Sequence, residues 1–527
     1  MKNNYLKTIG SDLPASIVVL LVALPLCLGI ALGSQAPLFS GIIAGVVGGI
    51  VIGSLSGSHL SVSGPAAGLT VIVATAILKL PAYEAFLLAV VIAGVLQLLF
   101  GFLKAGVLGD YVPNSVIKGM LAAIGIILIL KQFPHLVGYD KDFVGDESFS
   151  SGDENTFTGL FNAFSYFSQG AILIGGISLL ILIMWEQGFM KKQKSLKYIP
   201  GPLVVVILGV IINEWLKTAY PAIALTSNHL VTLPVASSVN ELAGFFRFPD
   251  LHHINNPNVW STAVTLAIVA SLETLLGIEA IDKLDTYKRV TPTNRELKAQ
   301  GMGNIVSGML GGLPLTSVIV RSSANFSSGA KSKMSTIYHG IMLALCVVFI
   351  PTVLNKIPLS ALAAILIFTG YKLAKVSLIR EFYNKGWDQF VPFIVTIIAI
   401  LFTDLLVGIV IGIFVGLFYM VRSNFRSSIL IVHDQNRYLV RLRKDVSFLN
   451  KPIVKRKLEE VPENSYVLID ATRADFIDKD VIDVVNEFLQ HAHLKNIRVD
   501  VKKSLHKPMH MLFKTPKAIE SLEFEPA

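Results

Sequence analysis

Two stretches of the sequence decide the fold: SHLSVSGPAAGL at residues 58–69 and GGLPLTSVIVRSS at residues 311–323. Each starts with a short run that is β-branched or contains serine, and each then turns to a helical pattern. About six extended residues at ~3.3 Å and about twelve helical residues at ~1.5 Å cover roughly 38 Å, which is enough to cross a bilayer. We therefore predict that each stretch is a strand followed by a half-helix that begins near mid-membrane.

The two stretches occupy corresponding positions in the two halves of the chain. Interrupted segments at matching positions indicate an inverted-repeat transporter with its substrate at the midplane. Two facing helix N-termini favour an anion, because each offers free amide hydrogens and about half a positive charge. Pro65 suits a first helical turn, and Ser322 or Ser323 could cap the second half-helix. The alternative is that these Gly and Pro residues only allow close helix packing.

Composition indicates a membrane protein with a soluble tail. Of 527 residues, 53% are hydrophobic and 15% are charged, which excludes a soluble enzyme, a fibrous protein and a disordered regulator. The last 102 residues hold 33 of the charged side chains. We therefore predict a transmembrane domain at residues 1–425 and a small cytoplasmic domain at residues 426–527. Cys27 and Cys346 both lie in apolar runs, so no disulfide framework is expected.

Apolar runs of suitable length predict fourteen spanning segments, arranged as two inverted halves of seven. The segments are expected at residues 13–33, 36–54, 61–78, 83–104, 113–133, 168–187, 199–213, 258–281, 297–310, 314–328, 335–353, 358–371, 388–403 and 405–421. The first is expected to be a span rather than a cleaved signal peptide, because no small-residue cleavage site follows it.

The net charge of +9 reflects topology rather than nucleic-acid binding. Basic residues gather in alternate connections, near residues 2–7, 191–197, 283–298, 331–333, 372–385 and 422–426, whereas residues 140–154 are acidic. The positive-inside rule then places these basic connections and both termini in the cytoplasm. We expect a multi-pass protein of the cell membrane, most consistent with a bacterial inner membrane.

Two ionisable residues, Glu273 and Arg321, lie deep in apolar runs, where a charge is costly and usually functional. Arg321 could add positive charge to a bound anion. Glu273 could exchange a proton, because burial raises a carboxyl pKa whereas a nearby arginine lowers it. A fixed ion pair between the two that only joins two helices is the structural alternative.

The sequence resembles the sulphate permease (SulP) anion transporters over nearly its whole length. The resemblance rests on DLPASIVVLLVALP at residues 12–25, SVSGP at residues 61–65, the acidic Glu273 and the basic Arg321. It implies a fourteen-span inverted repeat divided into a moving core domain and a static gate domain. It also implies a homodimer that transports a small inorganic anion, sulphate or bicarbonate, by an elevator-like movement.

The resemblance also implies an anion site between the first span and the two half-helices. Carried over by position, its contacts are Leu26, Ile30, Pro65, Ala66, Val320 and Arg321. Eukaryotic members commonly have Gln, an aromatic residue and Ser where this chain has Leu26, Ile30 and Val320. Fewer side-chain hydrogen bonds to the anion are therefore expected, with backbone amides and Arg321 as the main donors.

The acidic residue bears on the coupling ion. Sodium-coupled members of the family tend to have Asp here and Thr one turn later, whereas this chain has Glu273 and Gly277. Sodium prefers several oxygen ligands, so proton coupling through Glu273 is favoured. Sodium coupling stays open, because Thr316 and Ser317 could supply oxygens; anion exchange and a passive channel are further alternatives. No cofactor is expected.

The tail alternates strands and helices, which indicates a small α/β domain. Strands are expected at residues 437–442, 466–470 and 497–501, and helices at residues 451–460 and 478–494. The tail resembles the STAS domain that ends SulP transporters. The family's hydroxyl residue falls on Thr472, where we expect a helix N-cap or, as the alternative, a regulatory phosphorylation site.

Other functions fit the sequence less well. A nucleobase permease of the same fold would need a carboxylate where Arg321 stands. The four histidines between His491 and His510 lack cysteines and a ligand spacing, so no metal site is predicted. The membrane region has no constellation of nucleophile, base and metal, so we do not expect an enzyme.

Overall fold

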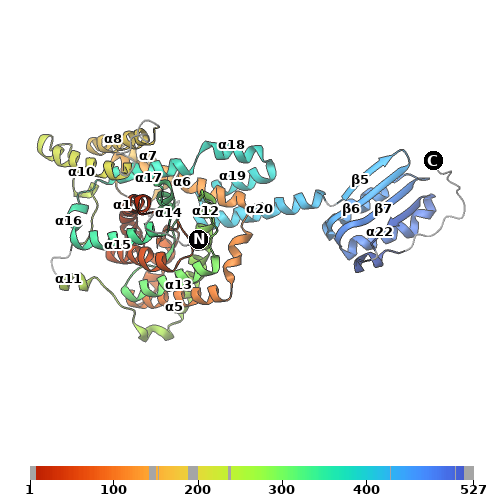
Figure 1. Ribbon diagram of the computed structural model, residues 1–527, viewed down its shortest axis with the longest axis horizontal. Helices are drawn as coiled ribbons and strands as arrows, with labels where there is room; N and C mark the ends of the chain where they lie inside the picture. Colours follow the sequence, from red (N-terminus) through yellow and green to blue (C-terminus); the bar gives the residue numbers. More distant parts are fainter. Residues whose placement is uncertain are drawn as a thin grey trace. The chain divides into compact units, whose positions relative to one another are not determined.

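The computed structural model describes residues 8–141, 150–151, 154–187, 200–235, 239–427, 429–504 and 506–514 (Figure 1). By their contacts, the residues form two compact units, Met1–Val415 and Gly416–Ala527. The division lies within α20 (Leu405–Ser427), close to the boundary at residue 426 that the charge distribution predicts. Each unit is described by itself below.

The first unit is almost entirely helical. In the described part of the chain, eight helical runs are long and apolar enough to cross a membrane. They are α1 (Ile9–Gly33), the run α2–η2–α3 (Leu38–Leu55), α5 (Tyr83–Phe102), α6 (Asn114–Val137), α8 (Gln169–Glu186), α10 (Gly201–Ala219), α12 (Pro257–Leu284) and the run α17–α18 (Leu359–Asn384). Shorter apolar helices cover Ala67–Lys79, α15 (Met334–Phe349), α19 (Trp387–Phe402) and Leu405–Val421. A multi-pass membrane fold follows, and the number of fourteen crossings stays a prediction.

The two interrupted segments form as the sequence predicts. Strand β1 (Ser63–Pro65) leads into η3 (Ala67–Leu69) and α4 (Thr70–Lys79), and β4 (Leu315–Ser317) leads into α14 (Ile319–Ser327). The two strands pair antiparallel, with Ser63 opposite Ser317 and Pro65 opposite Leu315. The pairing joins the two halves of the chain at the start of both half-helices.

Two local predictions about these segments are wrong. Pro65 ends strand β1 instead of opening a helix, because it takes part in the pairing with Leu315. Ser322 lies inside α14, which begins at Ile319, and therefore caps nothing. Its hydroxyl group donates a hydrogen bond to the Val318 carbonyl at 2.7 Å and accepts one from the Val62 amide at 2.8 Å. The serine thus fastens α14 to the chain that precedes β1.

Side chains support this short strand pair, since two strands of three residues have few hydrogen bonds of their own. The Asn304 side chain accepts from the Leu315 amide at 2.6 Å and donates to the Leu315 carbonyl at 3.1 Å. The Thr336 hydroxyl donates to the Ser61 carbonyl at 3.0 Å. All of these groups are buried, so the pair is held from helices on both sides.

The helices of the first unit pack as two groups. In the core group, α5 packs on α13 (Thr293–Leu310), and α1 packs on α2, α14 and α15. In the gate group, α6 packs on α7 (Thr156–Ala163), α8, α17 (Leu359–Leu373) and α19, while α8 also packs on α10. Figure 1 shows α8 and α10 on one flank, α5 and α13 on another, and α1, α12 and α14 between them. We name the two groups after the core and gate domains that the family resemblance implies.

Glycine pairs set the closest helix approaches in both groups. A Cβ atom on Gly94 of α5 would lie 2.6 Å from the Gly301 carbonyl oxygen of α13. In the gate group, a Cβ atom on Gly125 of α6 would lie 2.6 Å from the Gly370 carbonyl oxygen of α17. Small residues at such crossings let membrane helices pack backbone to backbone.

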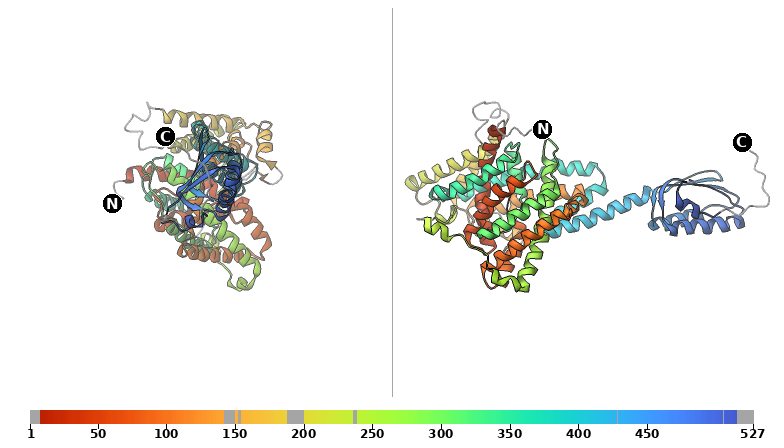
Figure 2. Two further views of the ribbon diagram at one scale, coloured as in Figure 1. Left: turned by 90° about the vertical axis from the view of Figure 1, so that its right-hand side faces the viewer. Right: turned by 60° about the horizontal axis from the view of Figure 1, so that its bottom comes forward.

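The second unit, drawn in blue in Figure 2, contains a sheet with helices packed along it. The sheet has four strands in the order β5-β6-β7-β8. The strands are β5 (Ile429–Asp434), β6 (Arg437–Val446), β7 (Tyr466–Ile477) and β8 (Arg498–Lys502), and only β5 runs antiparallel to its neighbour. Helices α21 (Lys451–Glu459) and α22 (Lys479–His491) cover the sheet. The unit fits a STAS domain. The predicted strands and helices are confirmed, and β5 was not predicted.

The predicted helix cap at Thr472 is wrong. Thr472 lies within β7, because that strand continues to Ile477. Its hydroxyl group donates to the Asp470 carboxylate at 2.6 Å. The N-cap of α22 is Asp478, whose carboxylate accepts from the Asp480 amide at 3.0 Å.

Candidate functional site

A cavity of about 30 Å³ lies between the core and gate groups at the start of both half-helices. On the core side, the lining comes from the β1–η3 turn, the β4–α14 turn and α12, which packs on α5 and α14. On the gate side, it comes from α6 and from α20, which packs on α19. The lining residues are Ala66, Ala67, Met120, Ile124, Glu273, Leu276, Thr316, Ser317, Val318, Ile319, Leu405 and Ile409. A space of this size holds a water molecule or two.

The N-termini of both half-helices open onto this cavity. Ala67 is the first residue of η3 and Ile319 is the first residue of α14, and both line the cavity. The first amides of a helix have no partner within that helix and carry partial positive charge. Most of the lining is apolar, so this charge acts in a medium of low dielectric constant. The arrangement suits a small anion.

Glu273 is the acidic group of the cavity. It lies on α12 with 7% of its surface exposed. A Cβ atom added to Gly68 would lie 2.0 Å from the Glu273 Oε1 atom, so the carboxylate sits directly against the first turn of η3. The positive end of that half-helix stabilises the ionised carboxylate. Glu273 and a bound anion would therefore share one positively charged region.

Hydroxyl groups lie beside Glu273 on strand β4. The Thr316 hydroxyl is buried, lines the cavity and has no hydrogen-bond partner among the described residues. The Ser317 hydroxyl is 2.7 Å from that of Ser61, and the Ser317 amide donates to the Thr274 hydroxyl at 3.3 Å. Gly277 makes room for this strand, since a Cβ atom there would lie 2.7 Å from the Ser317 carbonyl oxygen.

Arg321 points away from the cavity. Its side chain is fully buried, and one guanidinium nitrogen would lie 2.1 Å from a Cβ atom on Gly64. A Cβ atom on Gly45 would lie 3.9 Å from the same nitrogen and 2.6 Å from the Cys27 Sγ atom. The guanidinium therefore lies behind the strand pair, among β1, α1 and α2.

The guanidinium of Arg321 has no acidic partner among the described residues, and its polar neighbour is the Cys27 thiol. The alternative of a fixed ion pair with Glu273 is therefore wrong, since the carboxylate lies at η3 and the guanidinium lies behind β1. A buried charge without an acidic partner is costly, which points to a use for the positive potential itself. Across the strand pair, that potential adds to the potential of the half-helices.

Sequence reasoning missed His339, which accompanies Arg321. The imidazole, on α15, is fully buried, has no hydrogen-bond partner on either ring nitrogen among the described residues, and interacts electrostatically with Arg321. An ionisable residue within the apolar range 335–353 was the signal that could have revealed it.

The structure brings only some of the predicted anion contacts to the cavity. Ala66 lines it, and Pro65 precedes Ala66 at the end of β1. Val320 is the second residue of α14 and is buried. Leu26 and Ile30 are buried in the apolar core of α1, which packs on β1, α4 and α14, but they are not among the described residues that line the cavity.

A buried polar network on α13 supports β1 from behind. Glu296 is fully buried and accepts hydrogen bonds from the Ser56 hydroxyl at 2.5 Å and the Gln300 amide at 3.1 Å. Gln300 also donates to the Ser63 hydroxyl at 2.6 Å. Sequence reasoning missed Glu296 because residues 293–300 are not apolar, so nothing marked its carboxylate as buried.

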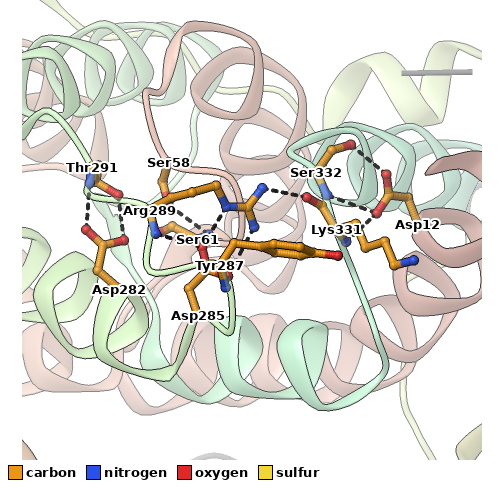
Figure 3. Close-up of polar contacts among 10 residues, drawn as sticks. All are labelled: Asp12, Ser58, Ser61, Asp282, Asp285, Tyr287, Arg289, Thr291, Lys331 and Ser332. Carbon is orange, nitrogen blue, oxygen red and sulfur yellow. Dashed lines mark hydrogen bonds and ion pairs between the residues drawn. The ribbon is translucent and has the colours of Figure 1, made fainter. Parts of the chain in front are cut away.

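A second network joins the start of α1 to the α12–α13 and α14–α15 connections (Figure 3). The Asp12 carboxylate, in the first turn of α1, accepts from the Lys331 amide at 2.7 Å and from the Ser332 hydroxyl at 2.5 Å. Arg289 donates to the Lys331 carbonyl at 2.8 Å and to the Asp285 carboxylate at 2.6 Å. Burial acts to raise the pKa of Asp285, but hydrogen bonds from Arg289 and the Tyr287 amide hold that pKa below its usual value. The network ties the start of α1 to the segments that follow α12 and α14.

Comparison with known proteins identifies the family. The model described as "Sulfate permease family" matches residues 9–396. The putative sulfate transporter YvdB of Bacillus subtilis (strain 168) is 26% identical over 448 residues, which cover 84% of this chain and 79% of that protein. The bicarbonate transporter BicA of Picosynechococcus sp. is 26% identical over 341 residues, which cover 62% of this chain and 55% of that protein.

Solved structures show the same fold. The transmembrane domain of a cyanobacterium bicarbonate transporter BicA aligns with a TM-score of 0.54 at 21% identity, covering 79% of this chain and 98% of that one. The murine Slc26a9 anion transporter in the inward-facing state aligns with a TM-score of 0.66 at 15% identity, covering 95% and 86%. These similarities extend to the fold alone, whereas the family model covers most of the sequence. The chain therefore belongs to the sulfate permease family of anion transporters, which are multi-pass membrane proteins and not enzymes.

Proposed function

We propose that this protein is a secondary active transporter that moves a small inorganic oxyanion, sulfate or bicarbonate, together with a proton. The observation that carries the proposal is the meeting of Glu273 and the two half-helix N-termini at one cavity. The half-helices supply the anion's binding energy, and Glu273 supplies the coupling.

The coupling follows from Coulomb repulsion. An anion at the half-helix N-termini would lie within a few ångströms of the Glu273 carboxylate, since both use the start of η3. Two like charges about 5 Å apart repel by ~3 kcal/mol at an effective dielectric constant of about 20. That energy corresponds to roughly a hundredfold in affinity. Protonation of Glu273 removes the repulsion, so the anion and the proton bind together.

Alternating access would come from movement of the core group against the gate group. Eight of the lining residues belong to the β1–η3 turn, α12 and the β4–α14 turn of the core group, whereas four belong to α6 and α20. A shift of the core group would carry both half-helices and Glu273 together past α6. We also infer fourteen crossings, cytoplasmic termini and a homodimer, consistent with the basic connections and with the family.

Sodium coupling is the second candidate, and one observation favours it. The unpartnered Thr316 hydroxyl, the Ser317 hydroxyl and Glu273 put several oxygen atoms around the same cavity. Oxygen ligands of this kind suit a hard cation. Gly277 supplies no further side-chain oxygen, so the set is smaller than sodium prefers.

The test is uptake of labelled sulfate and labelled bicarbonate into proteoliposomes under an imposed proton gradient or an imposed sodium gradient. We expect uptake of one anion to follow the inward proton gradient. Glu273→Gln should abolish accumulation driven by that gradient while anion binding, measured by an anion-dependent thermal shift, is retained. Glu279→Gln on the same helix, where Glu279 pairs with Lys283 at 2.9 Å, is the matched control and should behave as wild type.

Each contrary outcome has a defined meaning. A Glu273→Gln protein that still concentrates the anion under a pH gradient would remove this carboxylate from the coupling. Uptake that depends on the sodium gradient and not on the proton gradient would mean that sodium is the coupling ion. Thr316→Val should then abolish sodium-driven uptake. Uptake of neither anion under any gradient would contradict the proposed substrate class.

A further inference from the structure

Helix α18 (Val376–Asn384) connects two membrane helices of the gate group, α17 and α19, and presents an apolar surface that the protein leaves uncovered. Three side chains on one side of α18 and the first residue of α19 are largely exposed. We call them the α18 face: Val376 at 77%, Ile379 at 42%, Tyr383 at 60% and Trp387 at 66%. Spacings of three and four residues place Val376, Ile379 and Tyr383 along one line of α18. Trp387 follows the break between the helices at Gly386, and its ring centroid lies 6.3 Å from that of Tyr383.

The neighbouring side of α18 is fixed to the gate group. Phe382 is buried and stacks on Phe393 of α19, with ring centroids 4.6 Å apart and an interplanar angle of 3°. Leu378 packs against the same core. The protein therefore covers only some of the apolar side chains of α18 and leaves the α18 face exposed. The opposite side carries Ser377, Arg380, Glu381 and Asn384, which are all exposed. This three-sided pattern suits a helix that lies in the plane of a membrane surface.

Aromatic rings extend the α18 face into α19. The rings of Tyr383 and Trp387 each lie against Phe390, with centroids 5.4 and 5.8 Å apart. Tyr and Trp with an apolar body and a polar tip concentrate at the level of lipid headgroups. The cluster therefore marks the depth at which α18 lies, at the boundary between acyl chains and headgroups.

The charges around the α18 face are mainly positive. Lys372 pairs with Glu186 at 3.0 Å, and Lys385 pairs with Glu381 at 2.5 Å. Lys375 and Arg380 are exposed and have no ion pair with any described residue. Two unpaired cations beside an exposed apolar and aromatic surface complement an anionic headgroup above an acyl chain.

We propose that the α18 face binds anionic phospholipid, with Lys375 and Arg380 at the headgroup and Val376, Ile379, Tyr383 and Trp387 among the upper acyl carbons. The contact has a use in transport. α18 packs on α19, α19 packs on α6, and α6 supplies Met120 and Ile124 to the cavity wall. Lipid binding at α18 holds that wall at a constant depth while the core group moves.

The test uses Trp387 as its own reporter in the full-length protein. The chain has four tryptophans, and replacing Trp185, Trp215 and Trp260 by Phe leaves only Trp387. This protein is reconstituted in vesicles of phosphatidylcholine with a fixed fraction of phosphatidylglycerol, in which either lipid is brominated near the headgroup. Bromine quenches only a nearby indole. We expect stronger quenching by the brominated phosphatidylglycerol, with each of the two cations favouring the anionic lipid roughly fivefold.

Matched variants separate charge from depth. Lys375→Gln with Arg380→Gln should equalise quenching by the two lipids without reducing quenching overall. Lys455→Gln with Arg456→Gln removes the same charge from the exposed side of α21 and should leave the preference intact. A chain that keeps only Trp215, which is 56% exposed on α10, should show quenching without preference for the anionic lipid.

Two results would overturn the proposal. Equal quenching of Trp387 by both brominated lipids in the unmodified α18 background would exclude recognition of the anionic headgroup. Absence of quenching by either lipid would mean that the α18 face is covered by protein, such as a second copy of the chain, and not by lipid.

Discussion

At the scale of single residues, the missing side chain of Gly68 fixes the position of the Glu273 carboxylate. The Glu273 Oε1 atom occupies the space that a Cβ atom on Gly68 would fill. The carboxylate therefore rests on the first turn of η3 with no flexible group between them. Because of this close approach, the positive end of the half-helix attracts the negative charge of the carboxylate.

Gly68→Ala should impair transport without unfolding the protein. The added methyl group would lie 2.0 Å from the carboxylate oxygen, so Glu273 must move. We expect the uptake rate to fall roughly tenfold or more, because displacements near 1 Å at a reacting group have effects of that order. Uptake into proteoliposomes measures the effect. Gly176→Ala on α8, where a Cβ atom meets nothing within 4 Å, should transport as wild type; a similar loss in that control would contradict the steric explanation.

Arg321→Met should separate stability from anion affinity. The substitution removes a fully buried guanidinium without an acidic partner among the described residues and keeps most of its volume, so the melting temperature should stay constant or rise. Anion affinity should fall, because the positive potential behind the strand pair is lost. Thermal unfolding with and without sulfate or bicarbonate measures both quantities. Unchanged affinity would mean that the half-helix N-termini suffice.

The sequence identified Glu273 and Arg321 because a charge in an apolar run is conspicuous, but it did not give the directions of their side chains. Glu273 faces the cavity, whereas Arg321, which was expected to contact the anion, faces Gly64 and Gly45. The direction of the Arg321 side chain depends on contacts of α14 with β1 and α2, which are remote from α14 in the sequence. His339 also stands in an apolar run, but its interaction with Arg321 depends on the same packing and is not apparent from the sequence.

At the scale of elements, a histidine–aspartate–histidine bridge joins the end of α6 to the η6 turn (Ser227–His229). The Asp140 carboxylate lies 2.6 Å from His135 Nδ1 and 2.6 Å from His229 Nδ1. The Asp140 hydrogen bond raises the pKa of His229 above its ordinary value, more than burial lowers it. The bridge fixes the long connection between α10 and α12 onto the gate group.

The bridge predicts a pH dependence of stability. Because the pKa of His229 is raised in the folded state, its stabilisation is fully present below the unfolded pKa of about 6.5 and is lost as pH rises through the folded value. Between pH 6 and pH 8.5, the melting temperature should therefore fall more for wild type than for His229→Gln. Asp140→Asn should flatten the profile as well, whereas His433→Gln on β5 should leave it unchanged. Parallel profiles for wild type and His229→Gln would refute the assignment.

In the C-terminal unit, Asp478 should matter more to α22 than Thr472 does. The Asp478 carboxylate accepts from the Asp480 amide, and loss of such an N-cap costs about 1 kcal/mol. Asp478→Ala should speed amide hydrogen exchange in the first turn of α22 of the full-length protein. Thr472→Ala removes only a hydrogen bond to Asp470 and should leave that turn unchanged. The reverse order would restore Thr472 as the helix cap.

The broken segments were predictable as elements because strand and half-helix lengths follow from the thickness of the bilayer. Their details were not. Pro65 was expected in a helix, but its partner Leu315 keeps it in the strand. Strand β7 extends past Thr472 because β6 pairs with it as far as Ile477, a contact between segments that local pattern does not reveal.

At the scale of the whole molecule, the cavity, both half-helices and Glu273 belong to the unit Met1–Val415. The C-terminal unit has its own buried core on β6, β7, β8 and α22. Nothing in the cavity lining comes from residues after Ile409 in the described part of the chain. If this cavity binds the proposed anion, the choice of anion should be a property of the first unit.

A chain that ends at Arg426 should keep its order of preference among anions. Its uptake rate or its assembly should decline, since the C-terminal unit is lost while the cavity lining is intact. Competition of unlabelled sulfate, bicarbonate and chloride against the labelled substrate measures the order, and gel filtration measures assembly. A changed order would show that the C-terminal unit contributes to selectivity.

The strand pair β1–β4 also has a consequence for biosynthesis. Ser61 and Ser317, whose hydroxyl groups meet beside it, are 256 positions apart in the chain. At 5–20 residues per second, a ribosome needs roughly 10 to 50 s to make the intervening sequence. During this time the first half-helix is already synthesised, but β1 has no strand to pair with and its polar backbone has no partner in the lipid. The cavity at the strand pair therefore forms late in translation, and we expect the nascent first half to be shielded until β4 emerges.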